Sequence, residues 1–232
     1  MYYKYLNKDR KSPTQNWQWP PVGTWTPLID DLIICESGYH VCRPAPHFDL
    51  LEWYGEKLYE VEIRGKVINS DNKLCVTQAR LVRECKNWNP RTQRLFACDC
   101  AARVLKIFEA KYPKDKRPRE AIRVARAFAN GKATATELAT VWAAAGTTPD
   151  TTWAMTADAT WASTGAARAA QAAASGKTTQ ASTGAACAIW DDEWDVAWAA
   201  GDEAAASAGA ACAAEKKWQV ARMMKYIKRA IT

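Results

Sequence analysis

WNPRTQRLFACDCAARVLKIFEAKYPKDKRPREAIRVARAFANG, residues Trp88–Gly131, is the stretch in which the chain changes from sheet-like to helical patterning. Pro90 follows Asn89, an order typical of a helix start, because Asn caps helices and Pro fits the first turn. We therefore expect a long helix, packed on two sides, that joins two halves of the molecule. Its apolar residues recur at helical spacing: Leu95, Ala97, Cys98, Cys100, Ala102, Val104, Leu105, Ile107, Phe108 and Tyr112.

A second helix is predicted after the polar run Lys114–Arg117. Pro118 suits its first turn, and Asn130-Gly131 is a typical C-terminal stop. Arg119, Arg123 and Arg126 stand at i, i+4 and i+7, so they form one stripe opposite the apolar face.

Composition limits the class of protein. With 232 residues, 48% of them hydrophobic, the chain can bury a substantial core. No apolar run approaches the roughly 18 to 20 residues of a membrane span, and the N-terminus lacks the apolar centre of a secretory signal. We therefore expect no membrane association and a cytoplasmic protein. Eight cysteines are consistent with buried thiols in a reducing compartment.

Charge is segregated along the chain. Residues 1–88 hold 12 Lys/Arg against 11 Asp/Glu, residues 89–132 hold 12 against 4, residues 133–213 hold 2 against 9, and residues 214–232 hold 6 against 1. This pattern suits an acidic partner, but pairing between the chain's own helices explains it equally well.

The first part of the chain has the pattern of a small, mostly antiparallel sheet. Alternation places Tyr59, Val61 and Ile63 on one face, and a slip in the apolar phase between Val76 and Ala79 predicts a β-bulge. A short helical piece, Phe48–Tyr54, precedes this hairpin. The expected strands are Tyr2–Leu6, Leu32–Cys35, Gly38–Cys42, Leu58–Arg64 and Leu74–Glu84. Trp17, Trp19 and Trp25 lie in a proline-rich loop and are predicted to cover one end of the sheet, with an exposed aromatic surface as the alternative.

Alanine dominates the later part, with 31 of the 81 residues from 133 to 213. We expect short, closely packed helices there, because disordered segments are poor in aromatics and this one holds six tryptophans. Trp190, Trp194 and Trp198 recur every fourth residue, which favours core packing over base stacking. The fold class is therefore α+β. A β-rich domain (1–88) precedes a helical domain (89–232), made of a linking helix pair (89–131), alanine-rich helices (133–213) and a basic terminal helix (214–230).

Two basic clusters are the candidate partner-binding residues. A solvated helix face is the simpler interpretation of either one, but the pair would form a broad basic surface if both faced the same way. The residues are Lys111, Lys114, Lys116, Arg117, Arg119, Arg123, Arg126, Arg222, Lys225 and Arg229.

Catalytic and metal motifs are weak. The chain has no Cys-x-x-Cys pair, Walker loop, Gly-rich dinucleotide turn or HExxH. Cys35, His40, Cys42 and His47 are close in sequence, but their spacing fits no standard zinc pattern and buried thiols explain them better. We expect no metal and no cofactor.

Four segments resemble known families. CESGYHVCRP (35–44), LYEVEIRGKVI (58–68) and KLCVTQARLVREC (73–85) look like an uncharacterised domain of bacterial and phage proteins. Arg94–Gly131 is similar to the start of an immunity-protein family with an alanine-rich helical body. These resemblances imply phage–host conflict or toxin neutralisation inside a bacterial host cell, and no catalytic residues.

A further likeness connects the glycine-aromatic strand at Gly38 with ADP-ribosyltransferase-like folds. It implies NAD as cofactor, with Tyr39 and His40 near the nicotinamide and Glu62, Glu60 or Glu84 as the carboxylate. The leading hypothesis is instead a non-enzymatic inhibitor of the counter-defence, anti-CRISPR-like or toxin-immunity kind. Its basic helices would bind a protein or nucleoprotein with an acidic surface, and direct nucleic-acid binding is a third possibility.

Overall fold

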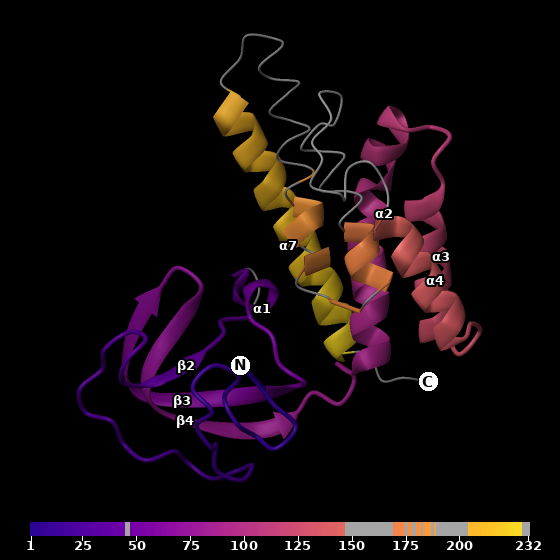
Figure 1. Ribbon diagram of the computed structural model, residues 1–232. Coiled ribbons are helices and arrows are strands. Elements are labelled where there is room, and N and C mark those ends of the chain that lie inside the picture. The colour runs from indigo at the N-terminus through magenta and orange to yellow at the C-terminus, as the bar shows by residue number, and fades with distance from the viewer. Residues whose placement is uncertain are drawn as a thin grey trace. The chain divides into compact units, whose positions relative to one another are not determined.

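The computed structural model describes residues 1–44, 47–146, 169–174, 176–177, 180–181, 183–186, 188 and 204–228. Within them the chain forms an antiparallel sheet followed by helices (Figure 1), which confirms the predicted α+β class. It divides into two units, one made of residues 1–89 with 223–232 and the other of residues 90–222. Of the six tryptophans predicted to pack in the alanine-rich part, Trp142 is exposed, so the prediction is wrong for this residue. The other five lie outside the described residues: Trp153, Trp161, Trp190, Trp194 and Trp198.

The sheet has four antiparallel strands in the order β1-β3-β4-β2. They are β1 (Tyr2–Leu6), β2 (Tyr39–Val41), β3 (Lys57–Ser70) and β4 (Lys73–Glu84). The first strand begins and ends where the sequence predicted. The hairpin is longer than predicted, because β3 continues six residues beyond Arg64 before its turn.

The two edge strands of the sheet meet. Tyr3 and Cys42 form a bridge, in which Tyr3 N donates to Cys42 O at 2.9 Å and Cys42 N donates to Tyr3 O at 2.8 Å. The sheet therefore curls until β1 lies against the end of β2, although they are at opposite edges of the strand order. This curl brings residues of β1 and β2 to one place.

The predicted bulge is present in the β3–β4 hairpin. Arg64 pairs with Gln78 and Val67 with Val76, so two residues of β3 lie opposite the single residue Thr77. Gly65 takes φ +85°, and a Cβ there would lie 2.0 Å from the Thr77 hydroxyl. That hydroxyl donates to Arg64 O at 3.0 Å. Glycine is therefore required at this corner.

The expected alternation of apolar residues fills the core of the sheet. Trp19 is buried there, and Trp17 packs against the cluster. Both residues thus cover the sheet core, as the sequence predicted. The core residues include Leu6, Tyr39, Val41, Tyr59, Val61, Leu74, Val76, Ala79 and Leu81. The predicted strand Leu32–Cys35 is wrong, because Ile33 bridges Ser37 across a tight turn that leaves Ile33 and Cys35 exposed.

Helix α2 (Pro90–Lys111) starts where Asn89-Pro90 predicted. Phe96 to Ala101 are buried without interruption, so the helix is covered on more than one side, as its apolar circumference indicated. Ala102, predicted to be apolar core, is exposed, and the charged Asp99 is buried instead.

Further helices are α1 (Asp49–Glu52), α3 (Arg117–Ala129), α4 (Ala135–Gly146) and α7 (Ala204–Lys228). Helix α3 ends at the predicted stop, where Gly131 takes φ +69° and Lys132 N donates to Ala127 O at 2.8 Å. In α7 the buried face includes the polar residues Glu215 and Gln219, whereas Trp218 is half-buried. Among the described residues, no helix is long and apolar enough to cross a bilayer.

Candidate functional site

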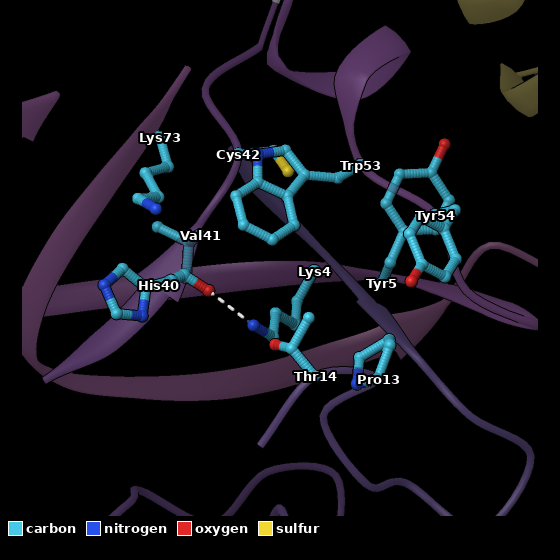
Figure 2. A pocket seen from close by; sticks show the side chains of 10 residues that line it. All are labelled: Lys4, Tyr5, Pro13, Thr14, His40, Val41, Cys42, Trp53, Tyr54 and Lys73. Carbon is cyan, nitrogen blue, oxygen red and sulfur yellow. Dashed lines mark hydrogen bonds between the residues drawn. The ribbon is translucent and has the colours of Figure 1, made fainter. Parts of the chain in front are cut away.

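A cavity of about 520 Å³ opens in the sheet unit, where the curl brings β1 and β2 together. A smaller adjoining hollow shares several of its side chains, and Figure 2 shows these side chains around one space. The residues common to both are Lys4, Thr14, His40, Trp53 and Lys73. Strands β1, β2 and β4 and two loops thus contribute to one site.

Lys4 projects from β1 into this site. Its Nζ donates to the carbonyl of His40 at 2.8 Å and lies 5.4 Å from the centre of the Trp19 ring. Burial, together with the like charge of Lys73, lowers the pKa of Lys4 to about 8. The amine is therefore held where its charge is poorly solvated.

Lys73, the first residue of β4, faces the same space. Its Nζ lies 3.1 Å from the Cys35 sulfur and 5.0 Å from the centre of the Trp53 ring. Trp53 is fixed in turn, because its Nε1 donates to Asn72 O at 2.9 Å. The β3–β4 turn thus positions both a cation and an aromatic wall.

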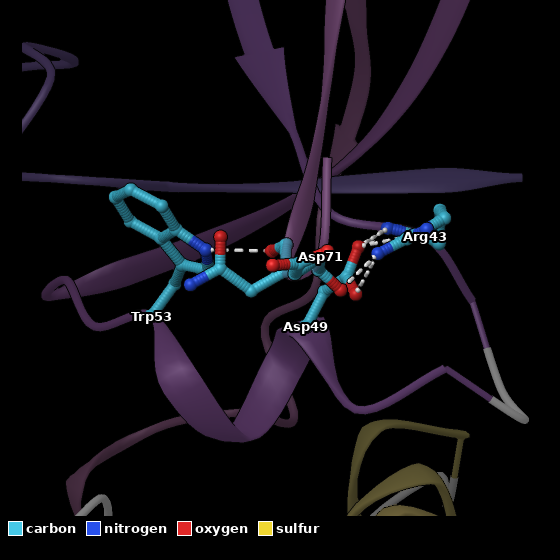
Figure 3. A network of polar contacts seen from close by, with 5 residues as sticks. Arg43, Asp49, Trp53 and Asp71 are labelled. Carbon is cyan, nitrogen blue, oxygen red and sulfur yellow. Dashed lines mark hydrogen bonds and ion pairs between the residues drawn. The ribbon is translucent and has the colours of Figure 1, made fainter. Parts of the chain in front are cut away.

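A buried ion pair anchors α1, which ends next to Trp53, as Figure 3 shows. Asp49 accepts from Arg43 Nε at 2.9 Å and from the Arg43 backbone N–H at 2.8 Å. Arg43 also donates to Asp71 O at 2.6 Å. Helix α1 is therefore tied to the same hairpin turn that supplies Lys73.

Tyr39 and His40, predicted in the NAD-dependent alternative, both line the cavity. The Tyr39 hydroxyl donates to Pro27 O at 3.0 Å, and its ring packs on Trp17 and Trp19. His40 Nε2 accepts from the Cys35 backbone N–H at 3.1 Å. Burial and the nearby lysines lower the pKa of His40 to about 4, so the ring is neutral at pH 7. Both side chains therefore stabilise the wall of the cavity through these contacts.

Glu62, the carboxylate of that alternative, does not line the cavity. It lies on β3 and pairs with Arg80 at 2.6 Å. Glu60 and Glu84 are likewise paired, with Arg83 at 2.7 Å and with Lys57 at 3.1 Å. Tyr39 and His40 therefore line the same cavity, and none of the three glutamates proposed as the carboxylate lines it with them.

The possible metal cluster is dispersed. Among the described residues, which include Cys35, His40, Cys42 and His47, no three His, Cys, Asp or Glu side chains come close enough to hold an ion. Cys42 is buried, and this burial raises the pKa of its thiol to about 12. Cys42 is therefore a buried thiol, as the simpler interpretation of the sequence expected.

In the helical unit, most of the predicted basic residues have carboxylate neighbours. Arg119 Nε donates to Glu109 at 2.6 Å, and its Nη2 donates to the second carboxylate oxygen. Lys116 lies 3.9 Å from the same Glu109. Arg123 donates to Glu120 at 2.8 Å, and Arg117 donates to Asp115 at 2.9 Å.

Arg126 and Arg222 share one buried carboxylate. Asp99 accepts from Arg126 at 2.8 Å and from Arg222 at 2.6 Å, so one side chain of α2 joins α3 and α7. A second pair, Arg103 and Glu215 at 2.7 Å, also connects α2 with α7. Arg126 and Arg222, which the sequence suggested for partner binding, therefore connect helices through Asp99.

The remaining predicted cations differ in their surroundings. Lys111 and Lys114 are exposed and have no carboxylate within salt-bridge distance among the described residues. Lys225 is exposed and belongs to the first unit, so the expected common surface with α3 remains a prediction. Arg229 lies outside the described residues.

Lys4 and Lys73 were not recognised from the sequence. Lys4 interrupts an aromatic strand, Tyr2–Leu6, and Lys73 follows a polar turn, where lysine is ordinary. The sequence offered one signal, the position of Lys4 within a predicted strand of tyrosines, where a lysine is unusual.

The geometry defines an α+β protein with an aromatic and cationic cavity in its sheet and ion-paired arginines among its helices. Residues 83–226 match the model of a family described as "Imm-5 like putative immunity protein", and the chain belongs to this family. Residues 1–90 match a domain of unknown function. No curated protein and no solved structure matches the chain.

Proposed function

We propose that this protein is an inhibitor of the immunity type, which binds an acidic protein surface through the basic corner between α2 and α3. We define the basic corner as Lys111, Lys114, Lys116, Arg119 and Arg123. Membership of the immunity-protein family supports the inhibitory role and implies a protein partner. The phage–host or toxin setting in a bacterial cell is part of this proposal.

One observation is the basis of the proposal: in the basic corner the cations lie outermost. The Arg119 and Lys116 side chains are 58% and 61% exposed, whereas the Glu109 side chain that they share is 17% exposed. Between residues 109 and 123 the chain has six Lys/Arg against three Asp/Glu. An approaching protein therefore meets positive charge first.

The ion pairs within the corner are compatible with binding. An exposed pair contributes only about 0.2–1 kcal/mol, so a partner's carboxylates can compete for the same guanidinium groups. Charge of one sign also accelerates encounter with a surface of the opposite sign. Lys111, Arg119 and Arg123 lie on regular helices, and Lys114 and Lys116 lie in the short connection between them. The helical positions therefore require little ordering of the backbone on binding.

The test is charge reversal at the corner. The double variant Lys114→Glu/Arg119→Glu, used as bait in bacterial lysate, should lose the partner by about tenfold or more. Lys66→Glu, an exposed change in the β3–β4 hairpin, is the matched control and should retain it. Arg126 is left intact because its partner Asp99 is 7% exposed and also binds Arg222, so its reversal would disturb the contact between three helices. Recovery of the partner is measured by quantitative mass spectrometry. Equal recovery with the wild type, the double variant and Lys66→Glu would refute the proposal.

Direct nucleic-acid binding is distinguished in the same experiment. If the partner is nucleic acid, nuclease treatment will remove it, and the affinity will fall steeply with salt. If the partner is a protein, nuclease treatment will leave the capture unchanged.

The NAD-dependent alternative remains a prediction. Tyr39 and His40 line a cavity, which favours it, and the pairing of Glu62 with Arg80 does not. An ADP-ribosyltransferase-like enzyme would consume NAD in a lysate, and His40→Ala and Tyr39→Ala would abolish this consumption. A flat NAD assay would exclude it.

A further inference from the structure

We propose that the cavity of the sheet unit binds a small organic anion that has a phosphate group and a planar ring, of about the size of a mononucleotide. Lys4 and Lys73 would bind the phosphate, and the half-buried Trp17 and Trp53 would contact the ring. This site lies entirely within residues 1–89 and is independent of the basic corner.

The first argument is charge. Four lysines of the sheet unit are half-buried: Lys4, Lys11, Lys57 and Lys73. Lys11 lies 3.7 Å from Asp9, and Lys57 lies 3.1 Å from Glu84. Lys4 and Lys73 have no carboxylate partner among the described residues, and both face the cavity. Glu36 also lines the cavity but lies beyond salt-bridge distance of both lysines. Because the Lys4 amine is buried, its charge is unfavourable there unless an anion joins it.

The second argument is unused hydrogen-bonding capacity. An ammonium group has three donors. In the described structure Lys4 donates once, to His40 O, and Lys73 donates once, to the Cys35 sulfur, a weak acceptor. Figure 2 shows the Lys4 amine directed at the His40 carbonyl and the Lys73 side chain on the same side of the site as the Trp53 ring. A phosphate group offers the acceptors that these donors lack.

The third argument is the aromatic lining and the volume. Trp17, Trp53 and Tyr39 line the cavity, and Trp17 is held by ring contacts to Trp19 and Tyr39 at 5.7 Å and 5.1 Å. At about 520 Å³ the cavity falls within the range of roughly 300–1,000 Å³ typical of small-molecule sites. Inorganic phosphate alone would leave most of it empty, whereas a planar ring can stack on tryptophan.

The cavity is also rigidly built. Gly38 takes φ +127° at its wall, where a Cβ would lie 2.4 Å from the Cys75 sulfur. Trp53 is fixed by its bond to Asn72 O, and the turn before β2 by the bond from Cys35 N to His40 Nε2. Such pre-organisation lowers the entropy cost of binding a ligand.

Calorimetry on the full chain tests the proposal, with AMP, GMP, CMP and UMP as probes and with inorganic phosphate and adenosine as the two partial ligands. At least one nucleotide should bind at least about tenfold more tightly than phosphate or adenosine. Lys4→Met and Lys73→Met should each weaken this binding by about tenfold or more, because each removes one cation from the phosphate. Lys66→Met removes an exposed lysine outside the cavity and should bind as the wild type does.

Each contrary outcome is decisive. If none of the four nucleotides binds at about 1 mM, or if both methionine variants bind the nucleotide as tightly as Lys66→Met does, the site is not an anion site. Phosphate binding as tightly as the best nucleotide would refute the role of the ring. Lys73→Met keeps the test valid if Lys4→Met fails to fold, and thermal melts of all variants check this.

Discussion

Arg222 and Asp99 are 123 positions apart in the sequence, yet Arg222 Nε lies 2.6 Å from Asp99 Oδ2. The other oxygen of the same carboxylate lies 2.8 Å from Arg126. A single buried acid of α2 thus holds cations from α3 and α7. Two arginines that the sequence suggested for partner binding therefore have a structural contact, which separates them from the exposed residues of the basic corner.

Replacing Asp99 with Asn should destabilise the helical unit. Breaking a fully buried ion pair costs about 3–5 kcal/mol, but Arg126 and Arg222 are 42% and 36% exposed and regain some hydration. We expect a loss of about 1–3 kcal/mol in the free energy of unfolding, measured by urea denaturation. Glu120→Gln, which breaks only the exposed pair with Arg123, is the control and should cost less than about 0.5 kcal/mol. Equal losses would mean that Asp99 has no special role.

Replacing Gly65 with Ala should destabilise the sheet unit through a clash at the bulge. Gly23 and Gly65 both have positive φ, +88° and +85°, so backbone strain is similar in the two Ala variants. A Cβ at Gly23 meets nothing within 4 Å, whereas one at Gly65 meets the Thr77 hydroxyl. Chemical denaturation should therefore show Gly65→Ala to be less stable than Gly23→Ala by about 1–3 kcal/mol. Similar free energies of unfolding for the two variants would indicate that the bulge rearranges to accept a Cβ at position 65 without loss of stability.

Lys4 should make stability rise with pH in alkaline solution. Its pKa is lowered from 10.5 to about 8, so between these values the unfolded chain binds more protons than the folded one, and deprotonation favours folding. The groups facing its amine are Lys73, His40 and Cys42. His40, with a pKa near 4, stays neutral throughout this range. From pH 7.5 to 9.5 the free energy of unfolding of the wild type should rise by about 1–2 kcal/mol relative to Lys4→Met.

The comparison with Lys4→Met is necessary because buried thiols act in the opposite direction. Burial raises the pKa of Cys42, Cys85 and Cys98 to about 12, so their contribution to stability is lost as the pH rises above 9. Lys4 does not act on Cys85 or Cys98, so their contributions cancel in the difference. Folded Cys42 stays protonated up to pH 9.5 in both proteins, because Lys4 lowers its pKa and this pKa is already about 12. A difference that stays constant over this range would show that the Lys4 amine is well solvated.

Cys35 should be the first of the described cysteines to react with iodoacetamide in the native protein. It is exposed, whereas Cys42, Cys75, Cys85, Cys98 and Cys100 are buried. Peptide mapping by mass spectrometry at pH 7.5 should find Cys35 modified and these five protected until denaturant is added, because alkylation needs an accessible thiolate. Labelling of Cys42 at the rate of Cys35 would show that the bridge between the edge strands opens easily.

The sequence by itself determined the local elements of this protein. Alternation in Tyr59, Val61 and Ile63 predicted one face of β3, Asn89-Pro90 predicted the start of α2, and the phase slip after Val76 predicted the bulge. Each of these signals depends on residues that are neighbours in the chain. The Leu32–Cys35 strand was predicted wrongly because a short apolar run is equally compatible with a tight turn, here closed by the bridge between Ile33 and Ser37.

Only the tertiary structure decided which charges meet. Lys4 and Lys73 face one cavity because the sheet curls and brings β1 against β2, and no local pattern encodes that closure. Asp99 lies within an apolar run of α2, yet its burial is stabilised by arginines from α3 and α7. Hydrophobic periodicity sets secondary structure over a few residues, whereas the fate of a charge depends on partners far along the chain.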